Sequence, residues 1–246
     1  MQLRSDAKTA PDFWIQHGKS AAGVTAVEPY IRWQSYHARS RRALQRWTID
    51  RLRADRRRYR IGVDLGCGNG EWTELFAPLC DELHACDVSP DFVAQTRART
   101  SWHRDTSVEV SDIRSFPIPS GADFIYVGAA FMYLQDRDVS DVLHRIAAHA
   151  APNAHVVIRD YCTYNLGLRT EYPSHGHSIH RPASHLLELA TNAGLRCDEL
   201  RSSFSIYGEL AANGIPGLQW PLRALLRFAT IPWTRSSHTL RFHARG

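Results

Sequence analysis

Three glycines at alternate positions, Gly66, Gly68 and Gly70, make VDLGCGNGEW the stretch of this sequence most suited to chemistry. They follow a short apolar run, typical of a buried strand, and precede a segment with helical spacing. A residue without a Cβ atom lets the backbone turn sharply and lets a ligand approach the amide groups, while the following helix offers its free N–H donors. The pattern predicts a ligand-binding turn between a strand and a helix.

The residue after the third glycine restricts the ligand. A dinucleotide fingerprint, G-x-G-x-x-G, would place its last glycine where this chain has Glu71. A carboxylate at that point repels a pyrophosphate, and the sequence has no G-x-x-x-x-G-K-[ST] pattern either. We therefore expect a ligand that has no phosphate beside the loop.

Strand-like and helix-like segments alternate on both sides of the loop, which is typical of a parallel sheet covered by helices. We expect strands at 59–65, 82–87, 107–110, 123–127 and 155–160, and helices at 30–55, 71–79, 90–100, 137–150 and 182–193. The first 28 residues are interrupted by prolines and glycines and are expected to form a loop. Two further strands, at 195–206 and 237–243, would pair around an insertion at 207–235, which contains an amphipathic helical pattern between Pro221 and Pro232.

Composition is that of one folded α/β core. The chain has 246 residues, of which 43% are hydrophobic and 22% charged, and no apolar stretch is long enough for a signal-peptide core or a membrane span. Five cysteines without a C-x-x-C pair favour a reducing cytoplasm over a disulfide framework or a zinc motif. Much of the net charge of +5 falls at 39–60, which predicts the solvated face of a helix and leaves an anion-binding patch as the alternative.

The glycine loop and three later segments resemble the class I S-adenosylmethionine-dependent methyltransferases. D-L-G-C-G-N-G is similar to motif I, LHACDVS to the end of the second strand, VEVSDIRSF to the adenine-binding segment, and ADFIYVGAAFMYL to the fourth strand and its loop. The resemblance covers about residues 59–200 and the closing strand. It implies that S-adenosyl-L-methionine is the cofactor, held by Asp64, Gly66, Cys67, Gly68, Gly70, Asp87, Val88, Asp112, Ile113 and Gly128.

The resemblance also implies particular contacts. Asp64 and the loop would lie against the methionine part, and Asp87 would accept hydrogen bonds from the ribose hydroxyls, since a carboxylate is an acceptor and a hydroxyl can donate. Asp112 would accept from the adenine amino group. The implied fold is a Rossmann-like, seven-stranded, mostly parallel sheet with helices on both faces, an N-terminal helical addition and an insertion before the last strand. We divide the chain into 1–58, a lead-in and helix that form part of the acceptor pocket, and the methyltransferase domain, 59–246, with 207–235 as a lid or interface.

The loop after the fourth strand narrows the acceptor by exclusion. It reads Gly128-Ala129-Ala130-Phe131, which lacks the elements of amino-methylating DNA methyltransferases, protein arginine methyltransferases and metal-dependent catechol-type enzymes. What remains is methyl transfer to an oxygen, nitrogen or carbon atom of a small molecule, without a metal. A surface loop explains the three histidines at 175, 177 and 180 better than a metal site does. The candidate catalytic residues are Tyr133, Asp160, Tyr161 and His175.

Two alternatives stay open at this point. The basic helix would serve an RNA methyltransferase, although no aromatic RNA-binding signature accompanies its arginines, so a nucleic-acid partner is disfavoured. A non-catalytic, methyltransferase-like partner protein is the other alternative. The insertion at 207–235 also leaves a homodimer open.

Overall fold

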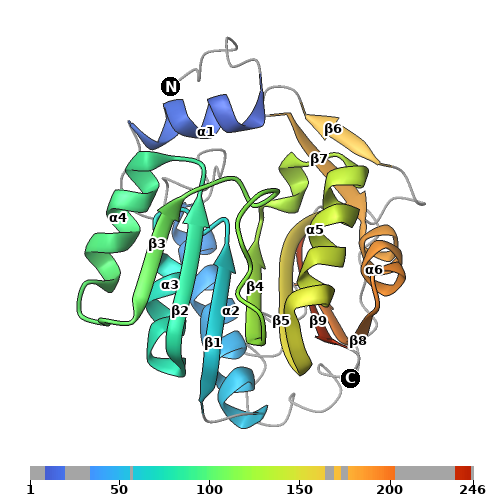
Figure 1. Cartoon of the computed structure of the whole chain (residues 1–246). Helices are drawn as coiled ribbons and strands as arrows, with labels where there is room; N and C mark the ends of the chain where they lie inside the picture. The colour runs from blue at the N-terminus through green and yellow to red at the C-terminus, as the bar shows by residue number, and fades with distance from the viewer. Residues whose placement is uncertain are drawn as a thin grey trace, which may run out of the picture.

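The computed structural model describes residues 9–19, 34–55, 58–163, 169–172, 177–202 and 236–244, and every statement below concerns these residues (Figure 1). The helices are α1 (Ala10–Gly18), α2 (Gln34–Asp55), α3 (Glu71–Phe76), α4 (Pro90–Thr100), α5 (Asp136–His149) and α6 (Ala183–Asn192), with short 3₁₀ turns η2 (Ala77–Leu79) and η3 (Phe131–Tyr133). The strands are β1 (Tyr59–Leu65), β2 (Cys80–Asp87), β3 (Thr106–Val110), β4 (Ala122–Gly128), β5 (Ala150–Thr163), β6 (Thr170–Tyr172), β7 (Ser178–Pro182), β8 (Leu195–Ser202) and β9 (Ser236–Ala244).

The described strands form one sheet in which β1 to β5 run parallel in the order β3-β2-β1-β4-β5. Strand β9 pairs antiparallel with both β5 and β8, so the last two long strands close the sheet as predicted. In register, Leu65 at the end of β1 lies opposite Cys86 of β2 and Val127 of β4. The carboxyl ends of these strands therefore meet at one edge, where open α/β sheets bind their ligands.

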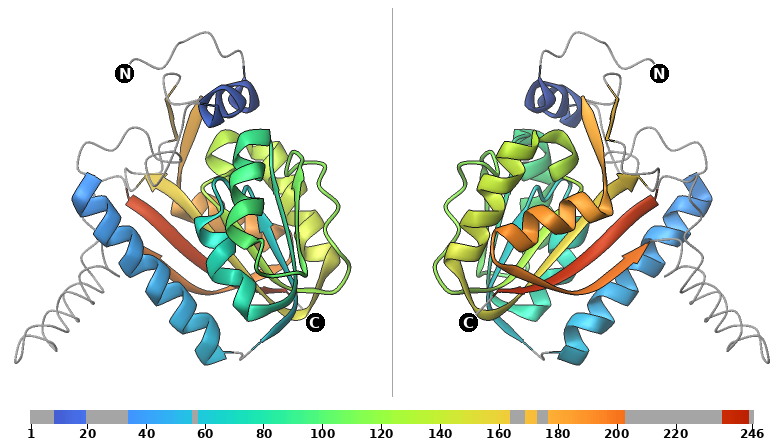
Figure 2. Two further views of the ribbon diagram at one scale, coloured as in Figure 1. Left: turned by 90° about the vertical axis from the view of Figure 1, so that its left-hand side faces the viewer. Right: turned by 90° about the vertical axis from the view of Figure 1, so that its right-hand side faces the viewer.

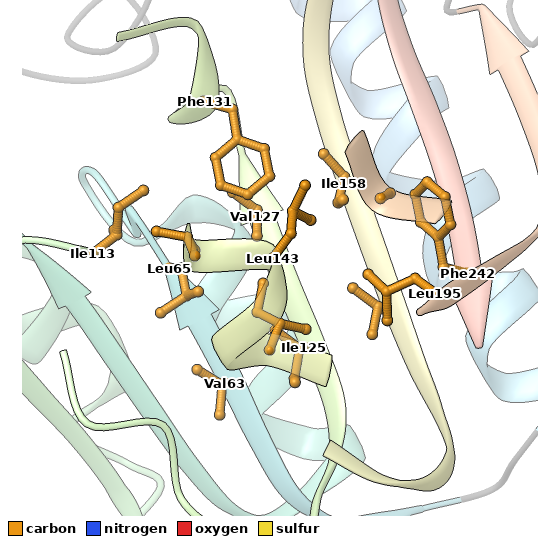
Figure 3. Close-up of a cluster of buried hydrophobic side chains, with 14 of the residues drawn as sticks. Val63, Leu65, Ile113, Ile125, Val127, Phe131, Leu143, Ile158, Leu195 and Phe242 are labelled. Carbon is orange, nitrogen blue, oxygen red and sulfur yellow. The ribbon is translucent and has the colours of Figure 1, made fainter. Parts of the chain in front are cut away.

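Side chains that alternate along the central strands build a core on each face of the sheet. On β4, Phe124 and Tyr126 pack with α2 and α3, whereas Ile125 and Val127 pack with α5 and α6. Figure 2 shows the helices on the two sides of the sheet, and Figure 3 shows the second core, in which Leu143 of α5 lies over β1, β4 and β5. Burial of one such large aliphatic side chain contributes about 1.5–3 kcal/mol, so the two cores fix the strand ends that carry the site.

The predicted Rossmann-like fold is confirmed, and the bounds of β1 and α4 agree with the sequence prediction to the residue. Two short strands, β6 and β7, were not predicted; they form a hairpin that extends the sheet beyond the end of β5. The predicted insertion at 207–235 lies outside the described residues. No helix among the described residues is both long and apolar enough to cross a bilayer.

The prediction of a loop over the first 28 residues was wrong for helix α1. Thr9 is its N-cap, and its Oγ1 accepts a hydrogen bond from the backbone N–H of Asp12 at 3.3 Å. Pro11 lies in the first turn, where backbone N–H groups have no acceptor within the helix. The N–H that proline lacks is therefore not needed there, and Pro11 is compatible with the start of the helix. Gly18 allows α1 to lie against α4, because a Cβ atom there would come within 2.2 Å of Ser89 Oγ. Figure 1 shows α1 across the carboxyl edge of the sheet.

Candidate active site

A hollow of about 1020 Å³, including its open mouth, lies at the carboxyl edge of the sheet and beneath α1. Its described lining comes from helices α1 to α4, from strands β1, β2, β4 and β5 near their carboxyl ends, and from the loops after β1 to β4: Ala10, Pro11, Trp14, Arg41, Asp64, Gly66, Cys67, Gly68, Asn69, Trp72, Asp87, Val88, Phe92, Asp112, Ile113, Tyr126, Gly128, Ala129, Ala130, Met132, Tyr133, Leu134, Arg159 and Tyr161.

The glycine loop turns as its sequence predicts. Gly66, Gly68 and Gly70 have φ angles of 80°, 55° and 82°, in the left-handed region that side chains disfavour. A Cβ atom on Gly66 would also come within 2.9 Å of the Ala130 side chain. Thr96 of α4 donates a hydrogen bond to the Gly68 carbonyl at 2.8 Å, which fixes the loop from behind. The turn thus presents backbone to the hollow with no side chain in the way.

Asp87 is the last residue of β2, where the sequence places it, and it lines the hollow. Its carboxylate accepts hydrogen bonds from the backbone N–H groups of Gly68 and Ser89, both at 2.9 Å. Burial raises the pKa of Asp87 to about 6, against the opposing effect of these backbone hydrogen bonds. Each carboxylate oxygen has two lone pairs, so both oxygens can still accept from a ligand hydroxyl.

Asp112 and Ile113, which follow β3, also line the hollow. Arg114 donates to both carboxylate oxygens of Asp112, at 3.0 and 2.6 Å. Burial opposes ionisation of Asp112, but the hydrogen bonds and the charge of Arg114 outweigh it, so the pKa lies below its ordinary value. From α5, Arg145 donates to the carbonyl of Ile113 at 3.1 Å and so holds this segment against the core.

Asp64 is fully buried at the floor of the hollow. One oxygen, Oδ2, accepts a hydrogen bond from Thr73 Oγ1 at 2.7 Å, whereas Oδ1 has no partner among the described residues. Burial raises the pKa of Asp64 to about 7; the Thr73 hydrogen bond lowers it, and the nearby charge of Asp87 raises it. A buried acceptor without a donor is unfavourable, and a cationic ligand group would relieve it.

Beside Asp64 stands a group of residues that the sequence analysis did not assign to the site. Arg41 of α2 lines the hollow and forms an ion pair with Glu71 at 3.0 Å. Arg159 of β5 donates to Tyr126 Oη at 3.1 Å, and its guanidinium lies 5.7 Å from the centre of the Trp72 ring. This end of the hollow therefore carries buried positive charge next to a buried carboxyl group.

A signal for Arg41 was present in the sequence. Arg41, Leu44, Thr48 and Leu52 are buried and fall at one face of α2, with spacings of three and four residues. Their neighbours Arg42, Arg46 and Arg53 are exposed, as predicted for a solvated helix face. A charge at a core-facing position of an amphipathic helix marks a functional candidate.

The other end of the hollow is aromatic. Trp14 of α1 packs edge-on against Tyr133 with the ring centres 5.1 Å apart, and Tyr161 at the end of β5 stacks on His180 at 6.0 Å. Ala129, which opens the loop after β4, has a φ angle of 55°. Such a conformation is costly for a residue with a side chain and is found most often at functional sites. We call the lining residues Trp14, Tyr133 and Tyr161 the aromatic end of the hollow.

Three predicted site residues do not line this hollow in the described part of the chain. Gly70 lies behind the loop, where a Cβ atom would come within 2.8 Å of the Thr96 backbone, and Asp160 is buried with one oxygen accepting the backbone N–H of Tyr161 at 2.8 Å. Burial raises the pKa of Asp160 to about 7. His175 lies outside the described residues. Their direct participation stays a prediction.

Fold and site together define an α/β methyltransferase domain, and the comparisons agree. Residues 63–153 match the family model described as methyltransferase domain. The chain is similar to nodulation protein S of Sinorhizobium fredii, with 29% identity over 57% of this chain and 70% of that protein.

Two solved structures share the fold. One is N-methyltransferase NodS of Bradyrhizobium japonicum in complex with S-adenosyl-L-homocysteine, with a TM-score of 0.64, 16% identity and coverage of 95% of this chain and 99% of that one. The other is geranyl diphosphate C-methyltransferase of Streptomyces coelicolor, with a TM-score of 0.65, 13% identity and coverage of 97% and 98%. These findings support the class I S-adenosylmethionine-dependent methyltransferase superfamily and S-adenosylmethionine-dependent methyltransferase activity.

The residues present fit that cofactor. The side-chain-free turn at Gly66 and Gly68 accommodates a ligand against the backbone, and the carboxylate of Asp87 suits a ligand with hydroxyl donors. The unpartnered Oδ1 of Asp64 suits an ammonium group. No other predicted motif of the chain offers a comparable set.

Proposed function

We propose that this enzyme transfers the methyl group of S-adenosylmethionine to the nitrogen atom of an amine on a small molecule. The observation that carries the proposal is one hollow whose lining combines the glycine loop and the carboxylates Asp64, Asp87 and Asp112 with the aromatic side chains of the aromatic end. Support for nitrogen comes from the similarity to nodulation protein S and to the fold of an N-methyltransferase.

When bound, S-adenosylmethionine supplies a methyl group on a sulfonium, which is already a strong electrophile. Asp87 would accept from the ribose hydroxyls, and Asp112 and Ile113 would bind the adenine. Asp64 would bind the ammonium group of the methionine part, and Arg41 and Arg159, at the same end, would bind its carboxylate. These contacts would orient the cofactor and leave the aromatic end to the acceptor.

The aromatic end suits an amine for two reasons. An apolar wall disfavours a charged ammonium group, so the amine enters with its lone pair free to attack. As the nitrogen gains positive charge during the transfer, the electron-rich faces of the Trp14, Tyr133 and Tyr161 rings would stabilise that charge. These rings are also weaker nucleophiles than an amine, so they would not compete for the methyl group. A neutral amine needs no general base before the transfer, because its proton can leave to water afterwards. The main tasks of the protein are then alignment and exclusion of water.

Methyl transfer from radiolabelled S-adenosylmethionine tests the proposal. The acceptors are an aliphatic amine, an amino acid, an amino sugar and an arylethylamine, each beside the alcohol that replaces its amino group. We expect label on at least one amine and on none of the alcohols, with an N-methyl signal in the product spectrum. Label on the alcohols or on carbon would exclude nitrogen, and an enzyme that binds no S-adenosylhomocysteine would exclude methyl transfer from this site.

A further inference from the structure

The β6–β7 hairpin, which lies beyond the residues matched by the family model, contacts the aromatic end of the hollow through two adjacent residues. Strand β7 pairs with β5 at the end of that strand, where Arg181 lies opposite Cys162. Its residues Ser178 to Pro182 are all buried. Because neighbouring side chains of a strand point to opposite sides, His180 and Arg181 serve different parts of the wall.

Arg181 holds the loop that carries Tyr133. Its guanidinium is 3% exposed and donates to the carbonyls of Phe131 and Leu134, the first at 2.9 Å, and to Asp136 Oδ1 at 2.6 Å. One planar group thus joins both ends of the η3 turn to the first residue of α5. A lysine has a single donor centre and cannot reproduce this fork.

His180 serves the second tyrosine. It is 7% exposed, and its ring lies nearly parallel to that of Tyr161, at an angle of 22° and with the centres 6.0 Å apart. Both tyrosines line the hollow, but neither belongs to the hairpin, since Tyr133 lies in η3 and Tyr161 in β5. The hairpin therefore stands behind the wall, one residue behind each tyrosine.

We infer that the β6–β7 hairpin determines acceptor specificity, with Arg181 and His180 as positioning residues for Tyr133 and Tyr161. The inference rests on the proposed function, since that assigns the aromatic end to the acceptor. The cofactor end has its own support from a different arginine, because Arg145, within α5, donates a hydrogen bond to the Ile113 carbonyl. Changes in the hairpin should then alter acceptor use and leave cofactor binding intact.

The test labels the enzyme with 3-fluorotyrosine and assigns the fluorine signals of Tyr133 and Tyr161 with Tyr→Phe variants. We expect Arg181→Met to shift the Tyr133 signal and not that of Tyr161, and Arg181→Lys to do the same. His180→Ala should shift the Tyr161 signal and not that of Tyr133, whereas His180→Phe, which keeps a flat ring, should restore it. Arg145→Met is the matched control, an arginine that holds the other wall, and should shift neither signal.

Two binding measurements accompany the spectra. For Arg181→Met and His180→Ala we expect an S-adenosylhomocysteine dissociation constant within about twofold of the parent and a fall of about tenfold or more in kcat/KM for the amine that the enzyme methylates. Arg145→Met should instead weaken S-adenosylhomocysteine binding. If Arg181→Met fails to fold, as judged by circular dichroism, the comparison of His180→Ala with His180→Phe still tests whether the hairpin positions a tyrosine of the aromatic end.

Signals that move together in every variant, or that move in none, would overturn the inference. So would a loss of S-adenosylhomocysteine affinity as large as the loss of turnover. The two proposals can fail separately. If no amine is methylated, but the Arg181 variants shift only the Tyr133 signal and His180→Ala shifts only the Tyr161 signal, the proposed amine acceptor is wrong and the positioning of the tyrosines by the hairpin is supported.

Discussion

Asp87 accepts a hydrogen bond from the backbone N–H of Gly68, with 2.9 Å between Oδ2 and the nitrogen. The acid at the end of β2 therefore holds the glycine loop in shape as well as lining the hollow. Loop geometry and ligand contact depend on one side chain, so a change at this position affects both.

Asp87→Asn should weaken S-adenosylhomocysteine binding. Hydrogen bonds to a charged group contribute about 1.5–3 kcal/mol, which corresponds to roughly a 10- to 150-fold rise in the dissociation constant. Isothermal titration calorimetry measures it. Asp81→Asn is the control, because Asp81 begins the same strand but is exposed and pairs with Arg58 at the surface. Equal affinities of the two variants would remove Asp87 from the site.

Gly66→Ala should abolish cofactor binding and lower the melting temperature. The φ angle of 80° costs an alanine about 1–2 kcal/mol, and the new methyl group would meet Ala130 at 2.9 Å. Gly194→Ala has a similar φ angle of 93° but open space around it, so it should cost stability alone. Thermal melts with and without S-adenosylhomocysteine separate the two effects; a stabilising shift that survives in Gly66→Ala would contradict the expectation.

The stability of the free enzyme should depend on pH through Asp64. Burial places its pKa at about 7, above the ordinary 3.8, so the folded chain binds this proton more tightly than the unfolded chain does. The resulting stabilisation is complete below about pH 4 and is lost as the pH rises to about 7. Asp64→Asn, which has no charge to bury, should gain melting temperature relative to the parent between pH 5 and pH 8. A difference that stays constant over that range would rule this out.

Arg41→Met should discriminate between two ligands. If Arg41 binds the carboxylate of the methionine part, the affinity for S-adenosylhomocysteine falls by roughly 10- to 150-fold, the equivalent of about 1.5–3 kcal/mol, while the affinity for adenosine stays unchanged. The exposed Arg42 on the same helix supplies the control, Arg42→Met, which should change neither affinity. Equal losses for both ligands would show that Arg41 supports the fold of the pocket and does not contact the amino-acid part.

The sequence predicted the centre of the fold well because hydrophobic periodicity is strong there. Strand β1 is buried at every residue except Arg60, and α4 has a serine N-cap at Ser89 and a proline at its first position, so their bounds could be predicted to the residue. The same rules failed at the edges. Pro11 and Gly18 indicated a loop, but one lies where a helix starts and the other where α1 touches α4.

The residues that we propose to bind the cofactor could be located in the fold from the sequence because they follow strand ends in a fixed order. Asp64, Asp87 and Asp112 all line the hollow where the strands β1, β2 and β3 lead. Arg159 was missed because it directly follows the apolar run Val156 to Ile158 of β5, where a charged residue is easily taken for the end of a buried strand. The hairpin of β6 and β7 was missed because strands of three and five residues give too short a pattern to detect.

The antiparallel strand β9 has a consequence for biosynthesis. Among the described strands, β8 pairs with β9 alone, and β5 exposes the edge that faces β9 until residues 236–244 have left the ribosome. A nascent chain therefore carries an unpaired strand edge from the completion of β5 until β9 is made, a state prone to association with other chains. Chaperone dependence during expression, and insolubility of any version shortened before Ser236, are the practical outcomes to anticipate.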